Sequence, residues 1–181
     1  EFIEAVEESV TVSLAHTTAD YDTAMEAFRL GARQVTHLFN AMPNFTHRAP
    51  GVVGAALDSP WSRVELICDG IHIHPSVVRA VFKMFGPDRV VLISDTMRAA
   101  GMTDGKYDLG GQEVTVKGPL ATLADGTIAG SVTDLMACLK TAVSFGIPLA
   151  DAVRAAAGNS AQAIGVLDRV GSLGPGRRAN V

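Results

Sequence analysis

Ionisable side chains follow four β-prone runs of the chain, at the point where each run ends. The four residues are His16, His37, His72 and Asp95, which follow residues 10–15, 33–36, 64–68 and 89–94 in turn. In parallel sheets built from βα units, the carboxyl ends of the strands meet at one edge, and active sites form there. Chance can place one ionisable residue at such an end, but four in succession predict a functional site.

The residue types suggest metal-assisted hydrolysis. His37 comes 21 positions after His16, at the equivalent place in the next βα unit, and neutral imidazoles from adjacent strand ends can bind one metal ion. Such an ion keeps a position open for water and lowers the pKa of that water. Asp95 is then placed to act as general base and afterwards as general acid. His72 could donate a hydrogen bond to a carbonyl oxygen as charge develops on it.

Each of these assignments has a structural alternative. A single histidine at a strand end is more often a hydrogen-bonded structural residue, and Asp95 could cap the turn that follows it. A two-histidine metal motif at His72 and His74 is disfavoured, because Pro75 ends the strand at once and His74 is expected to face solvent. We expect His47, in a polar loop, to be a surface residue.

Arg48 is the one Lys or Arg residue between Phe39 and Leu57. A loop arginine is usually just solvated. However, an acidic protein that binds a phosphate needs a local cation, and the planar guanidinium group matches phosphate geometry.

The remaining pattern predicts the elements that position these residues. Helical spacing and cap residues predict helices over about 18–30, 75–86, 133–145 and 149–164, with a loop over 40–54 and hairpins over 106–128. Strands that alternate with helices form a parallel sheet. The sequence therefore predicts an α/β fold of the βα-barrel type.

Composition excludes several classes of protein. The chain has 181 residues, is 48% hydrophobic and carries a net charge of -4 with no basic run, so it has no electrostatic footprint for nucleic acid. It has no apolar stretch long enough to span a membrane. Cys68 and Cys138 lie in apolar contexts, which favours two free thiols in a reducing cytoplasm. The acidic, helix-like opening residues 1–8 contain no signal peptide and suggest a piece of a larger fold.

Several motifs together resemble one known family, and their order agrees over nearly the whole chain. They are Leu14-Ala15-His16-Thr17, Thr36-His37-Leu38-Phe39-Asn40-Ala41-Met42-Pro43, Arg48-Ala49-Pro50-Gly51, Cys68-Asp69-Gly70-Ile71-His72, Leu92-Ile93-Ser94-Asp95 and Gly126-Thr127-Ile128-Ala129-Gly130-Ser131. This combination is similar to the N-acetylglucosamine-6-phosphate deacetylases of the amidohydrolase superfamily. The resemblance implies the C-terminal half of a TIM-like (β/α)8 metallo-hydrolase barrel.

The resemblance also implies a reaction and a set of roles. Metal-bound water would attack the acetamide of N-acetylglucosamine 6-phosphate, giving glucosamine 6-phosphate and acetate. Asp95 would be the proton acceptor and donor, and the metal would be zinc, with iron or another divalent ion as alternatives. The implied metal ligands are His16 and His37. The implied substrate-binding residues are Asn40, Ala41 and Arg48 for the sugar phosphate, and Asp69, Gly70, Ile71, His72, Ile128, Ala129 and Gly130 for the sugar and acetamide. A cytoplasmic homodimer is implied as well, in which the phosphate-binding loop serves the neighbouring subunit.

The chain also departs from the family pattern. The third metal ligand of the family is a glutamate from an earlier strand, and no segment here corresponds to it. Residues 1–165 would form the second half of the barrel, and residues 166–181 an incomplete return toward a small β-sandwich domain, with a strand beginning at about 177–181. Because two histidines make a weak site, we expect the isolated 181 residues to bind metal weakly and to release little or no acetate.

Other functions stay open at this point. The galactosamine isomer of the substrate cannot be distinguished from the sequence. A cyclic amide hydrolase of the dihydropyrimidinase or dihydroorotase kind would not need the phosphate-binding role of Arg48. In a different class, the chain could be a non-catalytic half-barrel that acts only by association.

Overall fold

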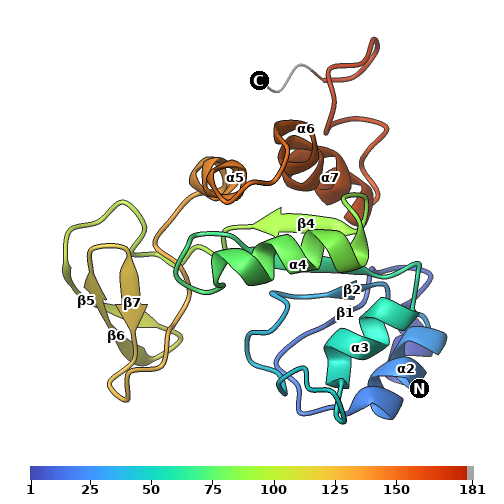
Figure 1. Ribbon diagram of the computed structural model, residues 1–181, viewed down its shortest axis with the longest axis horizontal. Helices are drawn as coiled ribbons and strands as arrows, with labels where there is room; N and C mark the ends of the chain where they lie inside the picture. Colours follow the sequence, from blue (N-terminus) through green and yellow to red (C-terminus); the bar gives the residue numbers. More distant parts are fainter. Residues whose placement is uncertain (179–181) are drawn as a thin grey trace.

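The main sheet has four parallel strands in sequence order. A computed structural model describes residues 1–178, in which β1 (Ser13–Leu14), β2 (Gln34–Val35), β3 (Arg63–Ile67) and β4 (Val90–Ile93) pair in the order β1-β2-β3-β4. Figure 1 shows these strands side by side, with helices on both sides of them. The predicted parallel α/β arrangement is confirmed. Strands β1 and β2 have two residues each and are shorter than the expected runs 10–15 and 33–36, and before β1 the Val10 N–H donates to Val6 O at the end of α1 (Phe2–Val6).

Helices α2 (Tyr21–Arg29) and α4 (Pro75–Phe85) begin and end close to where the sequence predicts. The Asp20 carboxylate caps α2 by accepting the N–H of Thr23 at 2.9 Å. The exposed His74 caps α4, because its Nδ1 accepts the N–H of Ser76. His74 is therefore a helix cap on the surface and not part of a two-histidine motif.

Helix α3 (Gly51–Asp58) was not predicted. The expected loop over 40–54 ends at Pro50, and the next eight residues are helical. Glycine disfavours a helix, and Gly51 and Gly54 hide the pattern in the sequence. Burial of residues 51–56 and packing against α2 outweigh that low propensity.

The C-terminal helices α5 (Leu135–Ser144), α6 (Leu149–Val153) and α7 (Asn159–Ala163) cover the main sheet. A π-helical turn, Arg154–Gly158, joins α6 to α7, so the helix expected over 149–164 is continuous but not regular. The buried Asn159 side chain follows this turn and donates to the carbonyl oxygens of Pro87 and Val90, both at 2.7 Å. These bonds fix α7 at the start of β4.

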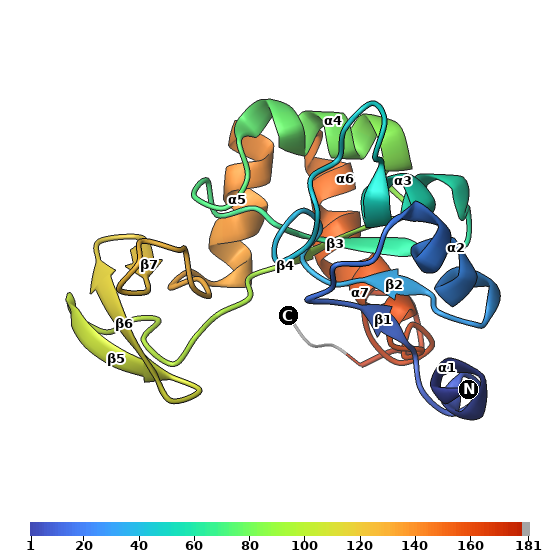
Figure 2. The same ribbon diagram turned by 90° about the horizontal axis from the view of Figure 1, so that it is seen from below.

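A second, antiparallel sheet contains β5 (Gly105–Leu109), β6 (Gln112–Lys117) and β7 (Leu120–Thr122), which confirms the hairpins expected over 106–128. Figures 1 and 2 show it standing beside the main sheet, on the chain between β4 and α5. It has a small core of its own, made of Met97, Ala99, Val114, Val116 and Ala121. It therefore packs as a separate layer next to the ends of the main strands.

The larger core lies between the main sheet and its helices. Cys68 and Cys138 are buried free thiols in this core, as expected, and burial raises their pKa values to about 12 and about 11. In the described part of the chain, no helix combines the length and apolar character needed to cross a bilayer.

The expected return toward a β-sandwich stays a prediction. Residues 166–178 form turns that fold back on themselves, and Arg178 N–H donates to Arg169 O at 2.9 Å. The strand expected at 177–181 falls largely on residues 179–181, which lie outside the described residues.

Candidate active site

The four ionisable residues come together at the carboxyl ends of the main strands. His16, His37 and Asp95 each stand two positions after the last residue of β1, β2 and β4, and His72 follows β3 after a short loop. They border one cavity of about 520 Å³, whose walls are His16, His37, Phe39, Asn40, Ala41, Ile67, His72, Asp95, Leu109, Gln112, Leu123, Thr127, Ile128, Ala129 and Gly130.

Backbone strain is concentrated on this cavity. Among the described residues, the non-glycine residues with positive φ are His16 (42°), His37 (31°), Phe39 (75°), Ala41 (51°) and Asp95 (49°). All of these border the cavity. The left-handed region is costly for such residues and persists where the surrounding structure enforces it, most often at functional sites. The two histidines and the aspartate are therefore turned out of their strands toward one point.

The rings of His16 and His37 lie within hydrogen-bond distance of each other and close enough to share one metal ion. Their Nε2 atoms lie 3.0 Å apart, and their rings meet edge to face at 75°. Two nitrogens bound to tetrahedral zinc at the usual bond length lie about 3.3 Å apart. His37 is buried, and its Nδ1 has no hydrogen-bond partner among the described residues. Both imidazoles thus fit a shared divalent cation.

A complete metal site is not formed by the described residues. They contain no group of three or more His, Cys, Asp or Glu side chains arranged to hold a metal ion. Catalytic zinc sites use three protein ligands. The donor set fits two of these three positions.

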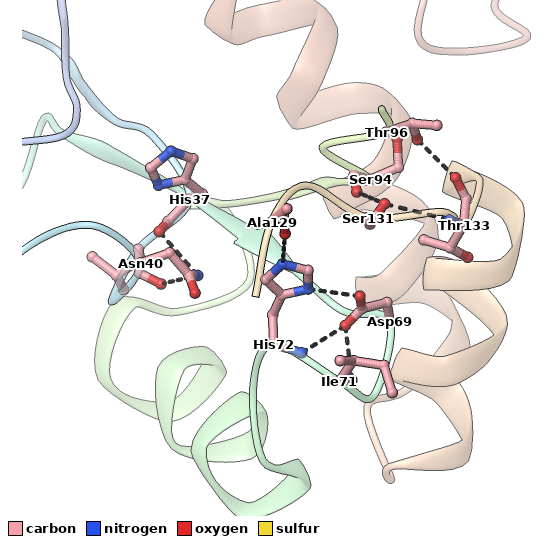
Figure 3. A network of polar contacts seen from close by, with 11 residues as sticks. His37, Asn40, Asp69, Ile71, His72, Ser94, Thr96, Ala129, Ser131 and Thr133 are labelled. Carbon is pink, nitrogen blue, oxygen red and sulfur yellow. Dashed lines mark hydrogen bonds and ion pairs between the residues drawn. The ribbon is translucent and has the colours of Figure 1, made fainter. Parts of the chain in front are cut away.

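His72 is held at both ring nitrogens, as Figure 3 shows. Nδ1 lies 2.7 Å from Asp69 Oδ2, and Nε2 lies 3.0 Å from the carbonyl oxygen of Ala129. Burial alone would lower the pKa of His72, but the hydrogen bond and charge of Asp69, the Ala129 carbonyl and the charge of Asp95 together raise it. Burial would raise the pKa of Asp69, but the hydrogen bonds from His72 and Ile71 lower it. Both groups therefore favour their charged forms.

This pair should make stability depend on pH. The raised pKa of His72 adds stability below its ordinary value of 6.5, which is lost as pH rises through the raised value. The lowered pKa of Asp69 adds stability above 3.8, which is lost as pH falls through the lowered value. We expect the difference in free energy of unfolding between the protein and its His72→Gln variant to be largest between these limits. Denaturant unfolding at a series of pH values measures it, and a difference that stays constant above pH 6.5 would contradict the pairing.

The loop after β2 carries Asn40 and Ala41 to the cavity wall. The Asn40 amide donates to the carbonyl oxygens of His37 and Leu38, both at 3.3 Å, and so braces the strained turn. Ala41 O accepts the N–H of Thr17 at 3.1 Å, which joins this loop to the one after β1.

Arg48 does not line the cavity that His16, His37, His72 and Asp95 border. Its exposed guanidinium contacts His47 at 2.7 Å and borders a different cavity of about 670 Å³, together with Tyr21, Asp22 and Pro50. Within one chain, Arg48 is therefore not on the wall of the histidine cavity. His47 is exposed, as expected from the sequence.

Of the other sequence-predicted residues, the structure places Ile128, Ala129 and Gly130 on the cavity wall, but not Asp69, Gly70 or Ile71. The reason is that the Asp69 carboxylate turns inward onto the His72 ring and backbone. Gly130 is closely packed, because a Cβ atom there would lie 3.1 Å from Asp95 O. The segment after β7 is thus pressed against the end of β4.

Sequence reasoning missed several neighbours of the site. Leu109 and Gln112 reach the cavity from the second sheet, on either side of the Gly110-Gly111 turn. No local feature of the sequence predicts that the β5–β6 hairpin lies next to the carboxyl ends of the main-sheet strands. Glu65, a half-buried carboxyl in β3, accepts a hydrogen bond from Gln34, and burial raises its pKa. A charge inside an otherwise apolar strand was the available signal for Glu65.

Known proteins are similar to this chain along its length. N-acetylglucosamine-6-phosphate deacetylase from Bacillus subtilis (strain 168) is 41% identical over 97% of this chain and 44% of its own length. N-acetylgalactosamine-6-phosphate deacetylase from Escherichia coli O157:H7 is 39% identical over 97% of this chain and 46% of its own length. The chain thus spans less than half of each of these relatives.

A solved structure shows the same similarity at the level of the fold. The crystal structure of N-acetylglucosamine-6-phosphate deacetylase from Pasteurella multocida superimposes with a TM-score of 0.94 and 36% identity, over 99% of this chain and 48% of that one. The described fold is therefore part of a TIM-barrel-type fold. The amidohydrolase family profile matches residues 1–181, and the chain belongs to the amidohydrolase family.

Proposed function

We propose that the protein containing this chain is a metal-dependent deacetylase that converts N-acetylglucosamine 6-phosphate to glucosamine 6-phosphate and acetate in the cytoplasm. The observation that carries the proposal is the convergence of His16, His37 and Asp95, all with strained backbone, on one cavity. The substrate is suggested by relatives of that name. Two buried free cysteines suit a reducing compartment.

Each site residue has a separate role in the proposed hydrolysis. His16 and His37 would hold the divalent metal, with zinc as the first choice. When bound, such an ion activates water and polarises the amide carbonyl. Asp95 takes the proton from the attacking water and returns it to the departing amine nitrogen as the carbon–nitrogen bond breaks. The Nε2–H of His72 lies against Ala129 O at 3.0 Å and would be shared with the acyl oxygen as negative charge develops there.

Binding of the rest of the substrate is assigned to the surrounding loops. Asn40 and Ala41 would contact the sugar phosphate, and Ile128 to Gly130 would line the sugar and acetamide pocket, with the loop from Asp69 to Ile71 beneath His72. We also propose a homodimer in which Arg48 reaches the phosphate in the partner's site. In support, Arg48 borders a separate cavity in its own chain.

The isolated 181 residues should be a poor enzyme. Two histidines provide fewer ligands than a catalytic metal site needs, so we expect weak metal binding and little or no acetate release from this piece alone. Isothermal titration with zinc and an acetate assay measure both properties. Turnover by the isolated piece at a rate close to that of the full-length protein would refute this expectation.

A second candidate substrate is N-acetylgalactosamine 6-phosphate, because a relative of 39% identity carries that name. A substrate panel with the full-length, metal-loaded protein tests the choice. It contains both 6-phosphates, unphosphorylated N-acetylglucosamine and a cyclic amide. Preference for the glucosamine isomer supports the proposal, and preference for the galactosamine isomer replaces it. Hydrolysis of the cyclic amide alone would move the protein to a different amidohydrolase activity, and no hydrolysis at all would favour a non-catalytic association role.

A further inference from the structure

Asp69 is buried behind the cavity wall and makes two different kinds of contact. Its side chain is 4% exposed, and that of His72 is 6% exposed. Oδ1 accepts the N–H groups of Ile71 and His72, both at 2.9 Å. Oδ2 accepts the Nδ1–H of the His72 ring at 2.7 Å. Figure 3 shows both contacts on one carboxylate.

The two contacts serve different purposes. The Oδ1 bonds shape the loop between β3 and α4, and an asparagine oxygen would make them equally well. The Oδ2 bond is not needed for the loop. Instead it determines the orientation of the His72 ring and the proton on its Nδ1.

The other ring nitrogen points at a fixed acceptor. Nε2 lies 3.0 Å from Ala129 O. The backbone around Ala129 is anchored on both sides, because Ala129 N–H donates to Ala121 O at 3.0 Å and Ser131 N–H donates to Asp95 O at 2.8 Å. With an acceptor at each nitrogen, this geometry favours a ring that carries a proton on both nitrogens.

We propose that Asp69 is the positioning residue of this site, which holds His72 as a doubly protonated ring with its Nε2–H on Ala129 O at the cavity wall. The role of the N–H as donor to an acyl oxygen rests on the proposed function, whereas the state of the ring does not. Asp69 is thus assigned a role through His72, in place of direct contact with the sugar.

The test is the Asp69→Asn variant of the full-length protein, labelled with ¹⁵N-histidine. Asparagine keeps the Oδ1 contacts with its one side-chain oxygen and therefore presents an N–H₂ group to Nδ1. In the unsubstituted protein we expect both His72 nitrogens to show protonated ¹⁵N shifts at pH 7, whereas the variant should show a neutral ring. The unsubstituted protein alone can overturn the proposal, if its His72 is neutral at pH 7.

Kinetics give a second readout. If the protein deacetylates, Asp69→Asn should lower kcat about 10- to 100-fold, the range typical for residues that orient a functional side chain, and leave KM nearly unchanged. The matched control is Asp134→Asn, because Asp134 Oδ1 also accepts a backbone N–H, from Ala137 at 2.8 Å. The control should change neither kcat nor the His72 signals. An unchanged kcat in Asp69→Asn would overturn the positioning role.

The two proposals can fail separately. If the metal-loaded protein releases no acetate but the His72 signals change as expected in Asp69→Asn, the proposed function fails and the assignment of Asp69 stands. If acetate is released and the His72 ring stays doubly protonated in the variant, the assignment of Asp69 fails and the function stands.

Discussion

Replacement of Asp95 by Asn should lower kcat for acetate release by about 10²- to 10⁴-fold, the usual contribution of a positioned general acid–base. Asparagine keeps the size and shape of the side chain but cannot take a proton from water. The backbone of Asp95 is held by Ser131, whose N–H donates to Asp95 O at 2.8 Å, so the fold should tolerate the change. Steady-state kinetics with N-acetylglucosamine 6-phosphate measures the effect.

The control for this prediction lies at the opposite end of the same strand. Asp88 precedes β4, is exposed and pairs with Arg154 at 2.9 Å. Asp88→Asn should leave kcat and KM unchanged, because the active edge of such a sheet is at the carboxyl ends of its strands. A kcat for Asp95→Asn within threefold of the control, a margin well below the usual acid–base contribution of at least about 100-fold, would remove Asp95 from the mechanism.

Replacement of His37 by Ala should abolish tight metal binding. Residues that do not bind a metal but hydrogen-bond to its ligands already contribute about 10- to 100-fold to metal affinity. Loss of one of the two ligating imidazoles should therefore lower zinc affinity by more than about 100-fold. Competition with a chelating indicator measures the affinity of the full-length protein for zinc. The shift of thermal unfolding that zinc causes should disappear in parallel.

His74 provides the matched histidine control for metal binding. His74 lies between β3 and α4, close in sequence to His72, but it is exposed and caps α4. His74→Asn keeps a cap oxygen and should leave zinc affinity unchanged. Equal affinities for the His37→Ala and His74→Asn variants would contradict the metal assignment of His16 and His37.

The sequence predicted the elements that have strong local signals. Apolar runs such as residues 89–94 and caps such as Asp20 reflect local chemistry, and the structure places β4 and α2 there. Helix α3 has no such signal, because its helical form depends on burial against α2. Tertiary packing outweighed local propensity at that place.

The site was predictable only in part, for a similar reason. Residues that end strands could be aligned from the order of the βα units, which located His16, His37, His72 and Asp95. The positive φ of three of them is imposed by the surrounding loops and cannot be read from residue type. The inward turn of Asp69, and the contribution of Leu109 from the second sheet, depend on contacts between segments far apart in the chain.

One measurement tests the central claim most directly: acetate release from N-acetylglucosamine 6-phosphate by the full-length protein, first stripped of metal and then supplied with zinc. We predict negligible release without metal and sustained turnover after zinc is added, since the converging imidazoles of His16 and His37 would hold the ion beside Asp95. Failure to release acetate with zinc or any other divalent metal would contradict the deacetylase assignment. Equal turnover with and without metal would contradict the role given to the two histidines.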